Sequence, residues 1–271
     1  MKIFKNKKSL IDEISNKKDI AFIPTMGSIH EGHLSLIKKA KKDSKNVLVS
    51  IYVNPKQFNV NSDFKKYPRN IRKDIAILKK TKVKYLYLPT YADIYSFRPI
   101  LPVYLDRFSK KLCGKFKPGH FKGVVNVVNR FIEIIKPSLI YLGLKDFQQL
   151  NLIKLHINKK KIRTKIIACT TIREKNGIAL SSRNILLNKQ QIEIAVRIYK
   201  YLKNIKKKIV PANLKKKKLD ILNKIFLLGA KKIDYLEYIN IKTLKSPKKI
   251  NEIYNIFIAY YVGNVRLIDN L

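Results

Sequence analysis

Short apolar runs alternate with segments of helical periodicity through the first two thirds of the chain. The runs are β-branched or aromatic and nearly continuous, which is typical of strands buried on both faces. They span Ile20–Pro24, Val47–Val53, Tyr85–Leu88, Leu139–Gly143 and Ile166–Thr170. Between them, apolar positions repeat at helical spacing over Leu34–Lys42, Ile71–Lys80, Gly123–Ile135 and Phe147–Asn158. This alternation predicts an α/β fold with a doubly wound parallel sheet and a ligand crevice at the carboxyl ends of its strands.

The pattern changes after about Ser182. A loop is expected over Asn184–Asn188, helices over Lys189–Lys208 and Leu214–Leu228, and strands over Ile233–Ile239 and Ile256–Tyr261. These elements predict a second, smaller α+β domain of roughly ninety residues. The segment Gly263–Asn270 is interpreted as a domain-closing turn that carries an ion pair between Arg266 and Asp269.

The charge of the chain is extreme. Its 271 residues include 59 Lys and Arg against 18 Asp and Glu, a formal net charge of +41. Such a charge is typical of nucleic-acid-binding proteins, but the lysines are spread along the chain and accompany heavy use of Ile and Asn. That combination resembles the codon drift of an AT-rich genome. No zinc-finger spacing or RNA-recognition aromatic motif occurs, so a solvated lysine surface is the preferred interpretation and a nucleic-acid-binding protein the alternative.

The sequence also bears on the compartment. Cys113 and Cys169 lie far apart without metal-type spacing and are expected to be reduced thiols. No apolar run approaches membrane-spanning length, and the N-terminal residues lack the continuous hydrophobic segment of a secretory signal. A cytoplasmic protein is expected.

The most informative polar group is the histidine pair His30 and His33, which follows the first apolar run in the order His-Glu-Gly-His. A turn containing Gly27 leads into a helix there, and the exposed amides of a helix start suit an anion. Two imidazoles at such a place can donate hydrogen bonds to a phosphate chain as charge moves onto it. A strand, turn and helix with incidental histidines is the alternative. Because the turn needs only its glycines, a nucleotide site is favoured.

Further polar side chains follow the other predicted strands. Asn54 and Gln57 supply two amides, which suit an uncharged rim around a small hydroxy acid, although Asn54 before Pro55 can equally be a plain turn signal. Lys145 follows a glycine at the end of a later strand and is well placed for phosphate oxygens. Asp146 is predicted to cap the next helix, and Gln149 one turn further on could face the crevice.

Two loops add cations. Lys115, Lys117 and His120 lie in a Gly- and Pro-rich segment, which is either a mobile basic flap over phosphates or a solvated loop. Ser181, Ser182 and Arg183 offer two hydroxyls and a forked cation to a pyrophosphate leaving group, although such a triplet is common in surface loops.

A histidine pair combined with a distant basic serine loop resembles enzymes that activate a carboxylate with ATP, as class I aminoacyl-tRNA synthetases do. The resemblance to the pantothenate synthetase (pantoate–beta-alanine ligase) family is closer still. Six collinear segments carry it, and the ending Arg266–Asn270 also fits. The segments are Pro24–Leu36, Val53–Phe58, Asp63–Arg69, Pro118–Phe121, Lys145–Leu150 and Leu180–Asn184.

The resemblance implies a Rossmann-like nucleotide- and pantoate-binding domain over residues 1–172, a C-terminal lid domain over 173–271, and a homodimer. It implies ATP-dependent condensation of (R)-pantoate with beta-alanine to pantothenate, through a pantoyl adenylate, with release of AMP and pyrophosphate. Mg²⁺ would arrive with the nucleotide, and its protein ligands are unknown. Small molecules, and neither a specific nucleic acid nor a membrane, would be the partners. Another adenylate-forming or nucleotidyl-transferring enzyme with the same histidine motif is the alternative.

The resemblance also assigns residues. His33 is the family's proton donor, and His30, Lys145 and Arg183 join it as catalytic residues. Gln57 and Gln149 match the contacts to pantoate and beta-alanine. The ATP-binding positions are Met26, Gly27, Ser28, Ile29, His30, Glu31, Gly32, His33, Gly143, Leu144, Lys145, Asp146, Ile172, Leu180, Ser181, Ser182 and Arg183.

This chain departs from the family pattern at a few places. Leu144 stands where Glu is usual, and Lys117 stands where Arg is common, which keeps the charge but loses bidentate geometry. The C-terminal domain matches least. Because the histidine pair, Lys145 and Asp146 are retained, ATP binding is expected to be retained as well.

Overall fold

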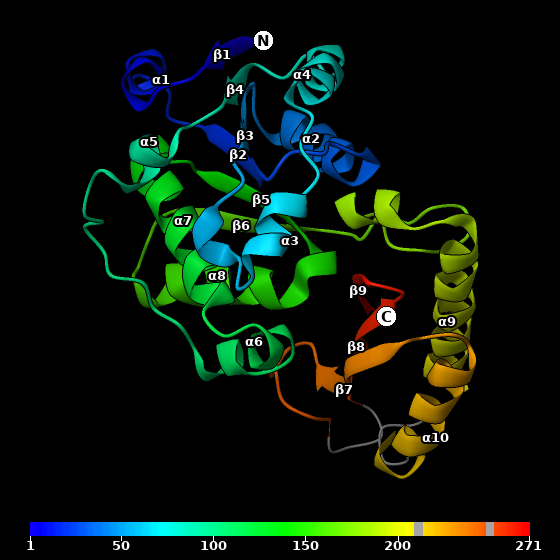
Figure 1. Cartoon of the computed structure of the whole chain (residues 1–271). Coiled ribbons are helices and arrows are strands. Elements are labelled where there is room, and N and C mark those ends of the chain that lie inside the picture. The colour runs from blue at the N-terminus through cyan, green and yellow to red at the C-terminus, as the bar shows by residue number, and fades with distance from the viewer. Residues whose placement is uncertain (209–213, 248–251) are drawn as a thin grey trace. The chain divides into compact units, whose positions relative to one another are not determined.

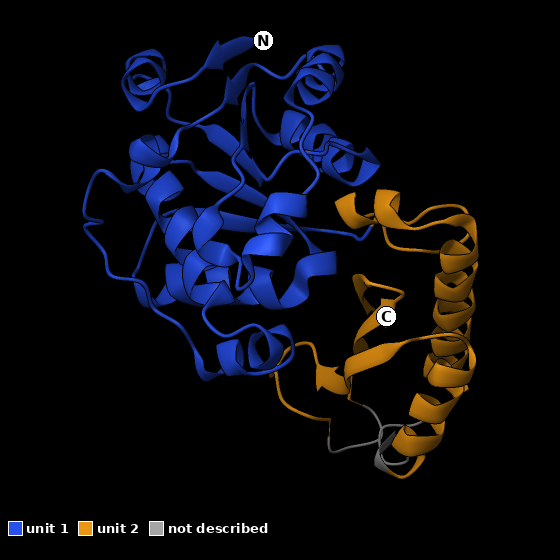
Figure 2. Ribbon diagram, in the orientation of Figure 1, with its two compact units in different colours: residues 1–171 blue, residues 172–271 orange. Residues whose placement is uncertain are grey.

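The chain forms two compact units, residues 1–171 and 172–271 (Figure 2). The computed structural model describes residues 1–208, 214–247 and 252–271. No helix within these ranges is long and apolar enough to cross a membrane. Each unit has its own sheet and its own hydrophobic core.

The first unit, which is described throughout, is built on one six-stranded sheet whose strands all pair in parallel (Figure 1). The strand order is β1-β4-β3-β2-β5-β6. The strands are β1 (Lys2–Phe4), β2 (Ile20–Thr25), β3 (Asn46–Ile51), β4 (Tyr85–Tyr87), β5 (Leu139–Gly143) and β6 (Lys165–Cys169). The predicted parallel sheet is therefore confirmed, with β1 as an additional edge strand.

Helices cover both faces of this sheet, because its strands are apolar on both sides. One face, which includes Ala21 and Val49, packs in a common core with α2 (Glu31–Asp43) and α4 (Ile71–Lys80). On the other face the rings of Phe22 and Tyr87 contact Phe131 of α7 (His120–Ile135). Helices on both faces of a parallel sheet make the fold doubly wound, as the sequence predicts.

The first unit contains further helices and 3-10 turns. They are α1 (Lys7–Ile14), α3 (Asn61–Lys66), α5 (Tyr91–Tyr95), α6 (Cys113–Phe116) and α8 (Phe147–Lys159), with the 3-10 turns η1 (Pro55–Gln57), η2 (Arg107–Lys110) and η3 (Leu144–Asp146). The sequence pattern predicts α8 and misses α1, whose first turn is capped by the Asn6 side chain accepting from the Ser9 amide.

The second unit combines helices with a small antiparallel sheet, which confirms the α+β class. Within its described residues, β7 (Lys232–Asn240), β8 (Tyr254–Val262) and β9 (Val265–Asn270) form the sheet in that order. The 3-10 turn η4 (Ser182–Leu186) precedes α9 (Lys189–Lys208) and α10 (Leu214–Leu227). Ile198 of α9 packs in one core with Ile225 of α10 and Ile258 of β8.

The interpretation of Gly263–Asn270 as a turn is wrong. Only the residues between Val262 and Val265 make the turn, and the rest is strand β9 paired with β8. The ion pair between Arg266 and Asp269 is not formed either, since residues three apart on a strand point to opposite faces. Instead Arg266 Nε lies 2.7 Å from Asp234 Oδ2, and Asp269 pairs with Arg173. The predicted loop at Asn184–Asn188 likewise begins inside η4.

Candidate active site

The order in which the chain adds strands to the sheet of the first unit reverses between β2 and β5. From β2 the chain moves outward through β3 and β4 on one side, and later through β5 and β6 on the other. Loops after neighbouring strands diverge at such a switch point and leave a crevice where ligands bind in open α/β sheets. The histidine pair follows β2, and Lys145 follows β5. Two segments that are distant in sequence thus follow the carboxyl ends of neighbouring strands.

The turn between β2 and α2 has an unusual backbone. Gly27 has φ +81° and Ser28 has φ +53°, so two successive residues lie in the left-handed region. A Cβ on Gly27 would lie 2.9 Å from Asp74 Oδ2, which explains why this position needs glycine in both conformation and space. Thr25 supports the turn, because its Oγ1 donates to the Ser50 carbonyl and accepts from the Gly27 amide.

Asp74 of α4 holds this turn from the other side. Its carboxylate is only 2% exposed and accepts the backbone amides of Ser28 and Ile29, each at 2.8 Å. Two successive N–H groups that converge on one carboxylate form an anion-binding concavity, here filled by the chain itself. Sequence reasoning missed Asp74, because it lies on a helix about 45 residues beyond the turn and no local pattern marks it.

His30 and His33 form a reciprocal cap at the start of α2. The Gly32 amide donates to Nδ1 of His30 at 3.1 Å, and the His30 amide donates to Nδ1 of His33 at 3.3 Å. The ring centroids are 4.1 Å apart. An imidazole nitrogen that accepts an N–H carries no proton, so each neutral ring holds its proton on Nε2. The backbone therefore sets the tautomer of both rings and makes Nε2–H the donor of each.

Both histidines are neutral at pH 7. Burial lowers the pKa of His30 to about 4, and the positive charge of Lys145 acts in the same direction. Burial lowers the pKa of His33 to about 3, with His30 and Lys145 adding to the shift. The charge of Lys145 therefore acts on both rings, and at His30 the charge of Asp146 opposes it. His30, His33 and Lys145 follow the carboxyl ends of the neighbouring strands β2 and β5.

The carboxyl end of β5 carries Gly143, then Leu144, Lys145 and Asp146 in η3. The Lys145 Nζ atom lies 3.8 Å from Asp146 Oδ1. Asp146 stands at the N-cap position of α8, as predicted, but its side chain makes no capping hydrogen bond there. Its carboxylate lies beside the ammonium of Lys145 instead.

The amide side chains after β3 have different surroundings. Asn54 is 1% exposed, caps η1, and donates to the Gly123 carbonyl at 3.2 Å, so it is a structural residue as well as a turn signal. Gln57 is buried, and its Nε2 contacts the Sδ of Met26 in the turn before the histidines. Gln149 is half-buried on α8. Gln57 and Gln149 therefore remain the candidates for the expected amide rim, because the side chain of Asn54 is used in hydrogen bonds within the fold.

The Gly- and Pro-rich loop is attached to its neighbours. Cys113–Phe116 form the short helix α6, and Lys117 Nζ lies 3.7 Å from Asp63 Oδ2 of α3. The side chain of Asn59 donates to the Pro118 carbonyl, and His120 Nδ1 lies 2.6 Å from the Gln57 carbonyl oxygen. His120 thus contacts the backbone of Gln57, a candidate substrate-binding residue.

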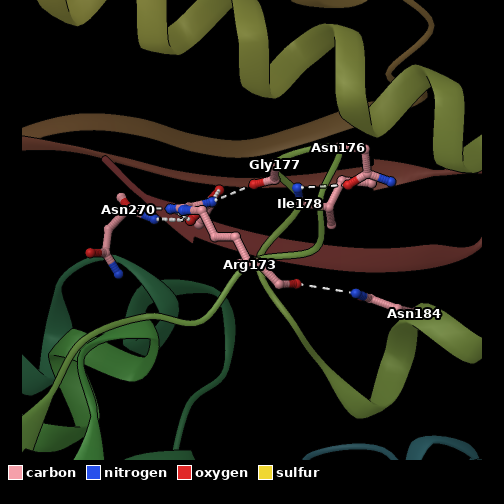
Figure 3. A network of polar contacts seen from close by, with 8 residues as sticks. Arg173, Asn176, Gly177, Ile178, Asn184 and Asn270 are labelled. Atoms are coloured by element: carbon pink, nitrogen blue, oxygen red, sulfur yellow. Dashed lines mark hydrogen bonds and ion pairs between the residues drawn. The ribbon is translucent and has the colours of Figure 1, made fainter. Parts of the chain in front are cut away.

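The remaining candidate positions, Ile172 and Leu180–Arg183, belong to the second unit. A hairpin brings them together, because the Leu180 amide donates to the Ile172 carbonyl at 3.0 Å. Ser181 caps η4 by accepting the Arg183 amide, and Ser182 is buried. Figure 3 shows the polar network around this hairpin, centred on Arg173, which sequence reasoning did not single out as functional.

The described residues contain no group of three His, Cys, Asp or Glu side chains that could hold a metal ion. The candidate positions include two imidazoles, an ammonium, a guanidinium and three serine hydroxyls, from His30, His33, Lys145, Arg183, Ser28, Ser181 and Ser182. These groups can donate hydrogen bonds to phosphate oxygens.

Comparisons with known proteins agree along the whole chain. The family model described as pantoate-beta-alanine ligase matches residues 2–271. A pantothenate synthetase from Fervidobacterium nodosum is 41% identical, covering 97% of this chain and 95% of the relative. Among solved structures, a pantoate-beta-alanine ligase from Francisella tularensis, complexed with beta-gamma ATP and beta-alanine, is 40% identical with a TM-score of 0.84, covering 100% of this chain and 97% of that one. The pantothenate synthetase from Thermus thermophilus has a TM-score of 0.86 at 27% identity, covering 100% and 99%.

Proposed function

Because the chain belongs to the pantoate–beta-alanine ligase family, we propose that the groups at its sheet switch point perform the two half-reactions of that ligase. The enzyme condenses (R)-pantoate with beta-alanine at the expense of ATP, through a pantoyl adenylate, and releases AMP and pyrophosphate. Family membership over the whole chain favours this activity over another adenylate-forming enzyme and over a nucleic-acid-binding protein.

In the first half-reaction, a carboxylate oxygen of pantoate attacks the α-phosphorus of ATP. The bond from that phosphorus to the bridging oxygen breaks, and pyrophosphate leaves with the charge. Such a step needs positioning and donors aimed at the phosphate oxygens. We assign this work to the Nε2–H groups of His30 and His33, the ammonium of Lys145 and the guanidinium of Arg183.

The observation that carries the assignment is the histidine cap. Both Nδ1 atoms accept backbone N–H groups, so each neutral ring carries its proton on Nε2. Both rings can therefore donate from Nε2–H to the same phosphate chain as Lys145. His33 is the proposed proton-donating residue, and it acts through a hydrogen bond from Nε2–H to the phosphate oxygens. Its Nδ1 remains the acceptor of the His30 amide, so the ring works in its neutral form.

Gly143, at the end of β5, supports a nucleotide site at the carboxyl ends of the strands. Gly143 has φ −77°, which any residue adopts, and a Cβ there would meet no atom within 4 Å. The fold therefore makes no demand for glycine at this position, whereas close approach of a nucleotide to the backbone would. We assign Gly143–Asp146 and Met26–His33 to ATP in the first unit, and Ile172 and Leu180–Arg183 to ATP in the second.

In the second half-reaction, the free amine of beta-alanine attacks the acyl carbon of the mixed anhydride. The bond from that carbon to the phosphate oxygen breaks, AMP leaves, and the ammonium proton is lost. Neither half-reaction needs a Ser, Cys or Lys nucleophile. Gln57 and Gln149 are the proposed contacts to pantoate, because neutral amides can donate to its carboxylate and accept from its hydroxyls.

Mg²⁺ is proposed to enter with the nucleotide, held mainly by phosphate oxygens, as is common where a protein offers one or two carboxylates at most. We also propose a homodimer that works in the cytoplasm. Sedimentation of the purified protein tests the proposed homodimer, and a single species with the mass of one chain contradicts it.

The test of the proposed mechanism is an isotope experiment. With ATP, Mg²⁺ and pantoate alone, the enzyme should release pyrophosphate in a single-turnover burst and retain the adenylate. With beta-alanine added, oxygen-18 from the pantoate carboxylate should appear in AMP. Label in inorganic phosphate, with ADP as product, would show an acyl-phosphate route and refute the proposed first step.

A further inference from the structure

The side chain of Arg173 ties together three parts of the second unit (Figure 3). Its Nη1 and Nη2 atoms lie 2.7 and 2.8 Å from the two carboxylate oxygens of Asp269 on β9. Nη1 also donates to the Gly177 carbonyl at 3.0 Å, and Nη2 to the Asn270 carbonyl at 3.1 Å. The guanidinium stacks over the ring of Tyr199 on α9 at 4.7 Å. A planar fork with this many partners is held in one orientation.

The hairpin that begins at Arg173 leads directly into the candidate phosphate residues. Arg173 pairs in antiparallel fashion with Ala179, and the Glu174 amide donates to the Ile178 carbonyl at 2.9 Å. The returning arm continues without a break into Leu180–Arg183. Asn184, just beyond, donates to the Ala179 carbonyl at 3.1 Å and to Glu174 Oε1 at 3.3 Å. The phosphate segment is therefore bonded to the hairpin at both of its ends.

We infer that the Arg173–Asp269 pair is a positioning device for the ATP-phosphate segment Leu180–Arg183, so that the last strand of the chain sets the conformation of a catalytic loop. The inference rests on the proposed function of that segment. Between β6 and α9 the chain has only the hairpin and η4, so the fold of this stretch depends on side-chain anchors. Holding the donors in one arrangement before ATP binds removes an entropic cost from the reaction.

The same sheet contains a matched control. Arg266 of β9 pairs with Asp234 of β7, with Nε and Oδ2 2.7 Å apart, and both side chains are buried. This second Arg–Asp pair joins two strands of the sheet, whereas the first joins the sheet to the hairpin. Loss of either pair weakens the unit, since breaking it leaves an uncompensated charge, which is partly buried at Arg173–Asp269 and more deeply buried at Arg266–Asp234. Only loss of the Arg173–Asp269 pair should change the conformation of Leu180–Arg183.

The experiment compares D269N and R173K with D234N in the full-length enzyme. We expect kcat/KM for ATP to fall about 10- to 100-fold in D269N and R173K, the scale set by misplacing catalytic groups by about 1 Å. The KM for pantoate should stay within about two-fold, and D234N should keep both constants. Hydrogen exchange supplies the second readout: the Glu174 and Leu180 amides should exchange faster in R173K and unchanged in D234N.

Three outcomes overturn the inference. Unchanged kcat/KM for ATP in folded R173K would do so, and so would an equal loss in D234N, because the effect would then be general stability. Unchanged exchange at Leu180 would also do so, and this readout decides the matter if D269N does not fold. R183A separates the two levels of proposal: if it leaves adenylate formation intact, the assignment of Leu180–Arg183 to ATP fails, whatever Arg173 does.

Discussion

At the residue scale, the two histidines of the motif each perform a structural and a chemical task. Their Nδ1 atoms accept backbone amides at the start of α2, and this leaves Nε2–H on each ring as the group for the substrate. The sequence predicts the imidazoles as donors at a helix start. It does not predict that they cap the helix as acceptors, because His is an uncommon cap and the reciprocal bond depends on the geometry of the turn.

Substitution of His33 separates the two tasks. His33→Ala removes both, whereas His33→Asn retains an acceptor, Oδ1, at about the place of Nδ1 and loses the outward donor. We expect both variants to lose about two to three orders of magnitude in kcat for adenylate formation, the usual effect of removing one preorganised donor. Only His33→Ala should also lose about 1 kcal/mol of unfolding free energy, the usual value of a lost cap. Pyrophosphate release and urea unfolding measure the two effects, and near-normal turnover in folded His33→Asn would refute a donor role for Nε2–H.

At the element scale, long buried elements could be predicted and contacts between elements could not. The helix Ile71–Lys80 and the strand Leu139–Gly143 have the predicted bounds, because a buried face leaves a clear periodicity. Strand β1 has three residues and is mostly exposed, so no period can form, and β9 was hidden by polar residues that pair across the sheet. Asp74 lies on a correctly predicted helix, yet its carboxylate serves a turn on another element.

Asp74→Asn tests how far helix α4 supports the histidine turn. Asparagine has one acceptor oxygen for two backbone amides, so one buried N–H is left unpaired at a cost of about 1–3 kcal/mol. We expect this loss in urea unfolding together with a several-fold rise in the KM for ATP, since Ser28 and Ile29 directly precede His30. Asp93 provides the control, because its carboxylate also accepts two backbone amides, from Lys7 and Thr90 at 2.8 Å each, but supports α5 instead. Asp93→Asn should lose stability and keep its KM for ATP; an equal rise in both variants would contradict a specific role for Asp74.

At the scale of the whole molecule, the parallel sheet, the second α+β unit and the family could all be predicted from the sequence. The anchoring of the phosphate hairpin could not, because Arg173 and Asp269 are 96 residues apart and their pairing depends on the register of β9. Local patterns carry the elements and the motifs at their ends. They carry no information about which distant carboxylate neutralises a partly buried cation such as Arg173, and that pairing decides how the hairpin is held.

The net charge of +41 is the property that neither the fold nor the reaction explains, and it predicts a marked response to salt. Even if all 18 acidic residues pair with basic ones, 41 of the 59 cations lack an acidic partner and repel one another. Raising the ionic strength from about 0.01 M to about 0.1 M shortens the Debye length from about 30 Å to about 10 Å. We therefore expect the Tm to rise, by about 2–4 °C for each kcal/mol of repulsion removed. Thermal unfolding in sodium chloride and in sodium acetate of equal ionic strength measures this, since screening depends on ionic strength whereas a specific anion site depends on the anion. A Tm that stays constant or falls would mean that the lysines are too far apart in the fold to repel one another appreciably.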